Sequence, residues 1–158
     1  MGIRMIVKHP EAVLREKCVE VKNFNANLHK LLDDMAQTMY DADGVGLAAP
    51  QVGILKRVIV MDCGDGLIEM VNPEIIEREG EQFGPEGCLS IPGVMGDVRR
   101  AMRVKAKGFD RHGNQIEVEG DELLARCIQH EIDHLNGVLF IDLAENMYER
   151  DPNQPDQG

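Results

Sequence analysis

His130-Glu131-Ile132-Asp133-His134 is the stretch of this 158-residue chain from which both its fold and its chemistry can be argued. The surrounding segment predicts a helix, and on a helix two side chains four positions apart lie on one face, with Cβ atoms about 6 Å apart. The two imidazoles can therefore bind one divalent ion, and the Glu131 carboxylate can reach a water on that ion. This HExxH spacing predicts a hydrolytic metal site. The alternative is a surface helix that carries these residues by chance.

The flanking residues set the limits of this metal-binding helix, which is predicted from about Asp121 to Asn136. Asp121 and Glu122 place negative charge at the positive N-terminal end of the helix, and Gly137 supplies a C-terminal stop. A second helix is predicted between a cap at Asn25 and the pair Asp43-Gly44. Its apolar residues recur at helical spacing and predict a core face: Leu28, Leu31, Leu32, Met35 and Met39. Pro10 can also open a short helix that ends at about Lys17.

Between the two main helices the pattern changes to short β-rich runs. The predicted strands are Arg57 to Met61, Leu67 to Val71, Glu74 to Glu79, Met102 to Phe109 and Gln115 to Val118. Because these strands are grouped between helices and do not alternate with them, the sequence predicts the α+β class.

Length and composition predict one soluble domain. We expect a single catalytic metallohydrolase domain over residues 1–150 and a disordered, polar acidic tail over 151–158. The N-terminus lacks a signal-type apolar core, and no run approaches the ~20 apolar residues that span a bilayer, so we expect a cytoplasmic protein without membrane contact. The net charge of −11 argues against a broad nucleic-acid-binding face, since phosphate contacts need clustered Lys and Arg.

A catalytic zinc-type site takes three protein ligands, so the two histidines need a third. The longer metzincin pattern would place it at Phe140, which cannot bind a metal, and the downstream Glu145 and Glu149 lie in a short acidic segment. Cys127 lies about 10 Å along the helix axis from His134 at 1.5 Å per residue, which is too far to share one ion. The isolated histidines fit ordinary surface or core positions better: His9, His29 and His112.

The cysteines offer one further candidate. Without a CxxC pair, free thiols or a metal ligand are favoured over disulfides for all four, Cys18, Cys63, Cys88 and Cys127. Cys88 lies between Pro85 and Pro92 in a short rigid segment that can enter an antiparallel sheet, and Gly87 permits a tight backbone path beside a metal. A thiolate there would complete a Cys-His-His site. A buried free thiol is the alternative from the residues alone.

Three motifs resemble, in order and spacing, those of the peptide deformylase family. They are GVGLAAPQ at Gly44 to Gln51, EGCLS at Glu86 to Ser90 and QHEIDHLNG at Gln129 to Gly137, and the resemblance covers nearly the whole chain except its tail. It implies a fold in which antiparallel sheets pack around a central metal-binding helix. It also implies removal of the formyl group from the N-terminal formyl-methionine of new bacterial polypeptides, with release of formate.

The resemblance also implies a role for each matching residue. Cys88, His130 and His134 match the metal ligands, and Glu131 matches the general acid/base. Gln51, through its side-chain amide, and Leu89, through its backbone N–H, match the donors to the developing oxyanion. The family is associated with ferrous iron in cells, and a Cys-His-His set also accepts zinc, nickel or cobalt.

The substrate site follows from the same resemblance. Val45 and Gly46 match the edge to which the substrate backbone adds as an extra strand, with Glu86 and Gly87 on its other side. By the same resemblance, an apolar pocket selects the methionine side chain. The candidates to line it are Cys127, Val45, Leu89 and the His130 ring. The expected partners are N-formylmethionyl peptides and nascent chains in the bacterial cytoplasm.

The chain departs from the family pattern in three places, one of which is Gln82-Phe83-Gly84 before the cysteine motif. Arg126 stands where the family often has an aliphatic pocket residue, which leaves the shape of the pocket open. From Asp142 onward there are five acidic residues and one arginine. Some family members dock on the ribosome through a basic C-terminal helix. Because this segment is acidic, the resemblance does not predict ribosome docking for this chain. Arg99 and Arg100 are expected to be solvated, with pairing to Glu86 as the alternative.

Two other functions remain compatible with the HExxH motif taken alone. A metal-dependent peptidase would cleave unformylated internal peptide bonds, which the missing downstream glutamate disfavours. A non-catalytic module would use the metal only to stabilise its fold, and it would need a fourth protein ligand at the metal.

Overall fold

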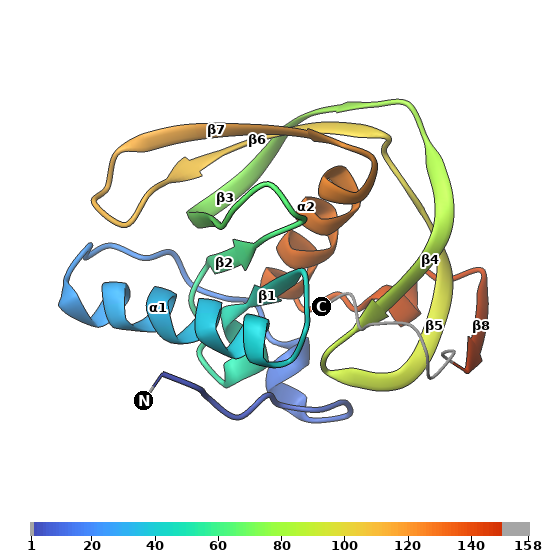
Figure 1. Cartoon of the computed structure of the whole chain (residues 1–158), viewed down its shortest axis with the longest axis horizontal. Helices are drawn as coiled ribbons and strands as arrows, with labels where there is room; N and C mark the ends of the chain where they lie inside the picture. The colour runs from blue at the N-terminus through green and yellow to red at the C-terminus, as the bar shows by residue number, and fades with distance from the viewer. Residues whose placement is uncertain (1, 150–158) are drawn as a thin grey trace.

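The computed structural model describes residues 2–149, in which a central α-helix lies between two antiparallel sheets (Figure 1). The larger sheet has the strand order β1-β2-β3-β6-β7. Its strands are β1 (Gly46–Ala48), β2 (Val58–Met61), β3 (Ile68–Glu79), β6 (Arg103–Phe109) and β7 (Gln115–Asp121). The smaller sheet has the order β4-β5-β8, with β4 (Gln82–Cys88), β5 (Ile91–Arg100) and β8 (Asn146–Glu149). The predicted α+β class is confirmed.

The central helix α2 (Glu122–Leu135) carries the HExxH motif, and its N-cap is Asp121, the residue at which the helix was predicted to begin. Its inner face packs on the larger sheet through a cluster that includes Ile128, Ile132 and Leu135. Gly137 ends the helix with a positive φ of 76°, and a Cβ atom at this position would clash with the backbone of Arg15. Glycine is therefore required both for the left-handed turn and for the close approach of the neighbouring chain.

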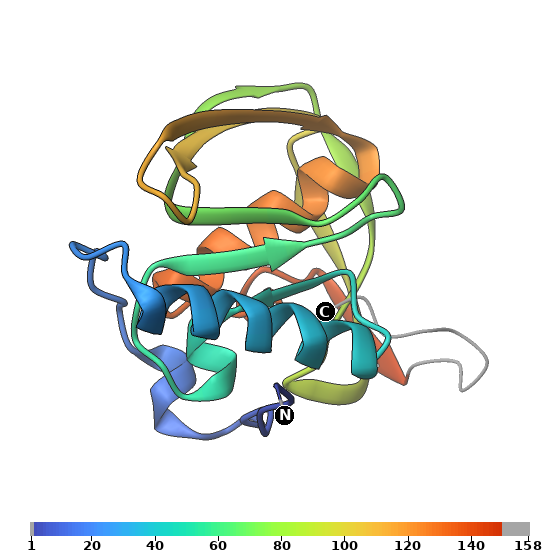
Figure 2. The same ribbon diagram turned by 60° about the vertical axis from the view of Figure 1, so that its left-hand side comes forward.

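The helix α1 (Ala26–Asp41) covers the opposite side of β1 and β2 (Figure 2). Asn25 caps it as predicted, because its side chain accepts a hydrogen bond from the backbone N–H of Leu28. The predicted apolar face is buried, and it forms a second cluster with residues such as Leu47 and Val58. The β1 strand and the loop that precedes it are thus held between α1 and α2.

Two of the predicted strands, Leu67 to Val71 and Glu74 to Glu79, are a single strand in the structure. Pro73 interrupts the sequence pattern because it has no N–H to donate to the ladder. The β3 strand continues past it through a shift of register against β6 between Val71 and Glu74. A bulge of this kind accommodates proline inside a sheet.

Most of the smaller sheet was not predicted from the sequence. β4 and β5 contain several glycines and prolines, which are typical of loops. Only the Pro85 to Pro92 segment was expected to enter an antiparallel sheet, and it does so, with Cys88 opposite Ile91. β1 and β8 were not predicted, and the helix expected from Pro10 to Lys17 is a shorter 3-10 turn, Ala12–Arg15.

None of the helices in the described part of the chain is both long and apolar enough to cross a membrane. The predicted tail, 151–158, lies outside the described residues.

Candidate functional site

Two elements far apart in the sequence bring the predicted metal ligands together. α2 contributes His130 and His134, whose ring centroids are 4.9 Å apart, and the end of β4 contributes Cys88. One nitrogen from each imidazole and the Cys88 sulfur all lie within 4.8 Å of one another. The Cys88 Sγ atom is 3.3 Å from His134 Nε2. All three residues are buried, so the candidate site is in the interior beside the helix.

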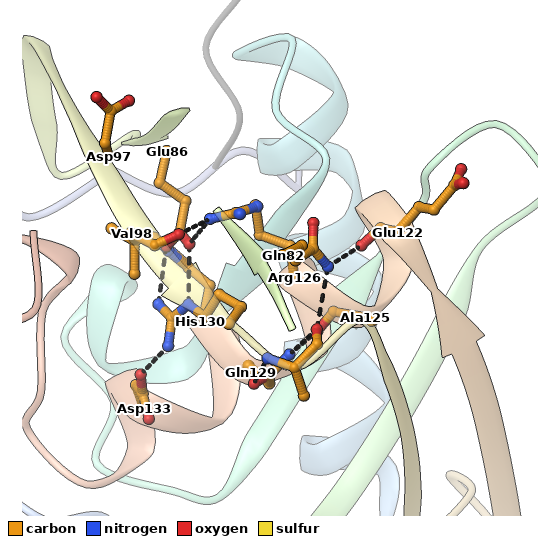
Figure 3. A network of polar contacts seen from close by, with 12 residues as sticks. Gln82, Glu86, Asp97, Val98, Glu122, Ala125, Arg126, Gln129, His130 and Asp133 are labelled. Carbon is orange, nitrogen blue, oxygen red and sulfur yellow. Dashed lines mark hydrogen bonds and ion pairs between the residues drawn. The ribbon is translucent and has the colours of Figure 1, made fainter. Parts of the chain in front are cut away.

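The His130 ring is held by contacts on two sides. Its Nδ1–H donates a 2.7 Å hydrogen bond to Glu86 Oε1 (Figure 3). Its face stacks on Phe140 at a centroid distance of 6.3 Å. A carboxylate accepts only from a protonated nitrogen, so the proton is placed on Nδ1 and the lone pair on Nε2. The ring therefore presents Nε2 to the space that it shares with Cys88.

The Glu86 carboxylate lies between two guanidinium groups. Arg100 Nη2 donates to Oε1 at 2.8 Å, Arg100 Nε donates to Oε2 at 2.9 Å, and Arg126 Nη1 donates to Oε2 at 2.6 Å (Figure 3). Arg100 also binds Asp133 at 2.6 Å. Burial by itself raises the pKa of the Glu86 carboxyl, but hydrogen bonds from Arg100 and His130 outweigh it and hold that pKa far below its ordinary value. Glu86 is therefore an anion that fixes the orientation of His130.

Replacing Glu86 by glutamine is expected to lower the free energy of unfolding by about 3–5 kcal/mol, because two buried guanidinium groups would lose their shared anion. Urea denaturation of chelated protein measures this loss without any contribution from a bound ion. Glu81→Gln is the matched control, since the Glu81 side chain is exposed and pairs with exposed Arg99. Equal denaturation midpoints for the Glu86 and Glu81 variants would contradict the buried network as a source of stability.

The expectation that Arg100 is solvated was wrong. Its side chain is only 5 % exposed, and it pairs with Glu86, whereas Arg99 pairs with Glu81 and Glu145 at the surface. Sequence reasoning also missed the contact between Arg126 and Glu86. The available signal was the spacing of Arg126 and His130, which lie four residues apart on one helix face and can bind the same partner.

Glu131 lies next to His130 in the chain, and its carboxylate contacts no hydrogen-bond donor among the described residues. Both of its carboxylate oxygens are buried and have no partner among residues 2–149. Burial is the main reason that the pKa of Glu131 is raised, to about 8. The Glu131 carboxylate packs against Gly46, where an added Cβ atom would overlap it and would lie 2.8 Å from Cys127 Sγ. A carboxylate that is buried and unpaired indicates a partner supplied from outside the chain.

The donor set fits a divalent metal ion. His130 Nε2 and the Glu131 oxygens are buried and unpaired among the described residues, and His134 turns its Nε2 toward Cys88 Sγ. Burial also lowers the pKa of His134 well below its ordinary value, which favours the neutral form that binds metals. Bonds of about 2.0–2.3 Å from nitrogen and sulfur ligands to one ion require ligand atoms about 3–4 Å apart, close to the spacing observed here.

The predicted oxyanion donors lie next to Cys88. The Gln51 side chain is fully buried, and its Oε1 accepts a 3.0 Å hydrogen bond from the backbone N–H of Ala48. Its Nε2 donates to Ser90 Oγ at 3.1 Å and to Cys88 Sγ at 3.5 Å. Leu89 is buried and follows Cys88 directly in the chain. The Ser90 contact, which orients the Gln51 amide, was not foreseen from the sequence.

A small pocket opens beside His130. It is lined by Val45, Glu86, Gly87, Leu123, Arg126, Cys127 and His130. Two of the predicted substrate-site residues, Gly46 and Leu89, do not line this pocket. A Cβ atom built at Gly46 would lie 2.8 Å from Cys127 Sγ. A hydrogen bond with Cys63 and burial both raise the pKa of Cys127, so the pocket wall carries a neutral thiol.

The chain matches one protein family over nearly its whole length. The sequence model of the family described as "Polypeptide deformylase" matches residues 3–150. The peptide deformylase of Thermoanaerobacter pseudethanolicus is 58% identical over 144 residues, which cover 91% of each chain. That of Pelotomaculum thermopropionicum is 52% identical over 154 residues, which cover 98% of this chain and 99% of the relative.

Solved structures agree with the sequence relatives. The crystal structure of peptide deformylase from Thermotoga maritima superposes with a TM-score of 0.90 at 43% identity, covering 92% of this chain and 100% of that one. The deformylase of Synechococcus elongatus, solved in complex with actinonin, has a TM-score of 0.89 at 45% identity and covers 92% of this chain and 81% of that one. The chain therefore belongs to the peptide deformylase family, and it is a metal-dependent hydrolase that removes the N-formyl group from newly made polypeptides.

Proposed function

We propose that Cys88, His130 and His134 hold one divalent ion and that Glu131 is the general acid/base of the deformylation. The observation that supports this assignment is the convergence of three ligand atoms within 4.8 Å beside a buried carboxylate that has no protein partner. The ion, when bound, supplies a Lewis acid that polarises the formyl carbonyl and lowers the pKa of a water molecule.

Glu131 takes the proton of the attacking water and later passes it to the departing amine. Its position next to His130 on α2 keeps it close to the ligand cluster, and neither of its oxygens is committed to another side chain. Burial raises the pKa of this carboxyl to about 8, so the group can both accept and return a proton near neutral pH. A nearby cation would lower this pKa and favour the carboxylate that begins the cycle.

Gln51 and Leu89 stabilise the negative charge that develops on the formyl oxygen. The Gln51 amide cannot easily turn, because its oxygen is used by the Ala48 N–H and its nitrogen by Ser90. The remaining N–H of this amide points to Cys88 Sγ at 3.5 Å, on the side of the ligand cluster. Donors that are already oriented need no reorganisation as the charge forms, which is why such groups lower the barrier.

The substrate backbone adds to β1, with Val45 and Gly46 on one side and Glu86 and Gly87 on the other. β1 is an edge strand, paired only with β2 among the described strands, so its free edge can accept an extended peptide. Backbone pairing is independent of side chains, which suits an enzyme that acts on most nascent chains. The pocket that includes Cys127 receives the first side chain of the substrate.

Replacing Gly46 by alanine is expected to lower kcat/KM by about 10- to 100-fold, because the new methyl group displaces the Glu131 carboxylate and the Cys127 sulfur from their positions. Steady-state kinetics with formyl-Met-Ala-Ser measure the loss. Gly84→Ala is the control, since a Cβ there would make only an ordinary 3.7 Å contact with Arg126. Unchanged kinetics in the Gly46 variant would mean that the contact with Glu131 is unimportant.

We infer that the ion is ferrous iron in cells and that zinc, nickel or cobalt can replace it, since thiolate and imidazole ligands accept all four metals. The substrates are N-formylmethionyl peptides and nascent chains in the bacterial cytoplasm, without direct binding to nucleic acid or membrane. Docking to the ribosome through the C-terminal segment is not proposed, because that segment is acidic.

One experiment tests the metal assignment together with the activity. The protein is purified anaerobically, its bound metal is measured, and formate release from formyl-Met-Ala-Ser is followed before and after chelation. We expect activity to disappear with the ion and to return on addition of ferrous, nickel or cobalt ions. Activity that survives complete removal of the metal would refute the proposed role of the Cys88 cluster.

A further inference from the structure

Arg126 carries hydrogen-bond donors that the protein does not use. Its side chain is only 7 % exposed, and Nη1 donates to Glu86 Oε2 at 2.6 Å and to the Val98 carbonyl at 3.1 Å. A guanidinium has five N–H groups, so the three on Nε and Nη2 remain. Neither nitrogen has an acceptor among residues 2–149. A buried arginine normally has its donors satisfied by protein or by water, so these donors are open to an acceptor from outside the chain.

The same side chain forms part of the wall of the pocket beside His130. Figure 3 shows Arg126 reaching from α2 toward Glu86, next to His130. Its two unpaired nitrogens are not among the fully enclosed polar atoms without a partner, so they keep contact with solvent. The neighbouring wall is formed mainly by Val45, Leu123 and the neutral thiol of Cys127. The pocket thus has apolar residues and an arginine, anchored by Glu86, in its lining.

We propose that Arg126 adapts this pocket to N-formyl peptides whose first residue is methionine sulfoxide. The inference rests on the proposed function, in which the pocket receives the first side chain of the substrate. A sulfoxide keeps the length and the terminal methyl group of methionine but adds a strong acceptor oxygen on the sulfur. In a wholly apolar pocket this oxygen would lose its hydration without replacement. The free N–H groups of Arg126 offset that loss.

The reaction on such a substrate is the ordinary one. Water cleaves the formyl C–N bond, formate and the free amine are released, and the sulfoxide is neither reduced nor oxidised. Arg126 therefore acts on specificity, and no redox partner is needed. The ion pair with Glu86 keeps the guanidinium in place while its remaining nitrogens contact the substrate.

The test is the ratio of kcat/KM for formyl-Met(O)-Ala-Ser to that for formyl-Met-Ala-Ser, measured on one preparation of metal-loaded enzyme with the two sulfoxide epimers separated. For the wild type we expect a ratio within about fivefold of one for the better epimer. Arg126→Met keeps a linear apolar side chain and removes the donors, and we expect it to lower that ratio at least about tenfold. It should also reduce the difference between epimers, because a positioned donor can reach the sulfoxide oxygen of one epimer better than that of the other.

Arg111→Met is the matched control. It also removes an arginine from an ion-pair network, with Glu69 and Asp33, but Arg111 does not line the pocket, and the ratio should stay at the wild-type value. Both substrates react at the same active sites. If a variant is partly unfolded or only partly loaded with metal, both rates therefore fall by the same factor, and the ratio of the two kcat/KM values is unchanged. If Arg126→Met is too slow to assay, calorimetric titration with Met-Ala-Ser and Met(O)-Ala-Ser gives the same comparison from binding.

Two outcomes would overturn the inference. One is a wild-type enzyme that discriminates more than 100-fold against both sulfoxide epimers, and the other is an Arg126→Met ratio equal to that of the wild type. In either case normal turnover of formyl-Met-Ala-Ser would leave the proposed function intact. Absence of turnover with formyl-Met-Ala-Ser itself would instead count against the proposed function.

Discussion

Glu131→Gln is expected to retain its metal ion while kcat falls by about 100- to 10,000-fold, the range typical for loss of a general acid/base. Glutamine has nearly the same shape as glutamate but cannot accept the proton of the attacking water or return it to the leaving amine. The metal should remain because Glu131 is not one of the three residues whose ligand atoms converge. Formate release and metal content, measured on the same sample, separate these two effects.

Glu122→Gln provides the comparison on the same helix. Glu122 is exposed at the start of α2, far along the helix from the ligand histidines, and its loss changes the charge of the protein by the same amount. We expect the Glu122 variant to keep the wild-type kcat. A Glu131→Gln enzyme with full metal content and a wild-type rate would refute the assignment of Glu131 as the general acid/base.

Cys88→Ala is expected to lose both the ion and the activity. The two remaining imidazoles come from one helix and cannot enclose a divalent ion, since a catalytic site generally needs three protein ligands. We expect less than about a tenth of the wild-type metal content after dialysis, and a rate no higher than that of chelated protein. Elemental analysis of the dialysed protein and formate release check the two expectations.

The control for this substitution is Cys18→Ala, which removes another buried thiol. Cys18 packs in the cluster between α2 and the larger sheet, and burial raises its pKa to about 11, so it is a neutral thiol. We expect its loss to reduce stability modestly and to leave metal content unchanged. If Cys88→Ala bound metal as the wild type does, the third ligand would have to be another residue.

Much of the fold followed from local patterns. Apolar residues at helical spacing identified α1, and Asn25 marked its start, because capping and periodicity depend only on neighbours in the chain. The smaller sheet was harder to predict because Gly84, Pro92 and Gly96 weaken the usual signal of a strand. These strands exist because they pair with each other and with β8, and pairing between distant segments leaves little trace in composition.

The candidate site also has features that local sequence predicts and features that depend on tertiary packing. The positions of His130 and His134 on one face were clear from their spacing, and the three motifs together indicated the family, although Cys88 alone did not stand out from an ordinary buried thiol. The spacing of four residues acts through helix geometry, which is local and strong. The meeting of Cys88 with the histidines depends instead on how β4 packs beside α2.

Local sequence was thus sufficient to locate the metal helix and the chemistry that its histidines and Glu131 indicate. It did not reveal that Glu86 is buried between Arg100 and Arg126, or that Arg126 lines the pocket beside His130. Both features depend on residues 14 and 40 positions apart meeting in the interior. From sequence alone a charged residue is predicted to be exposed, because burial of a charge costs free energy. Only the folded chain shows where an opposite charge compensates that cost.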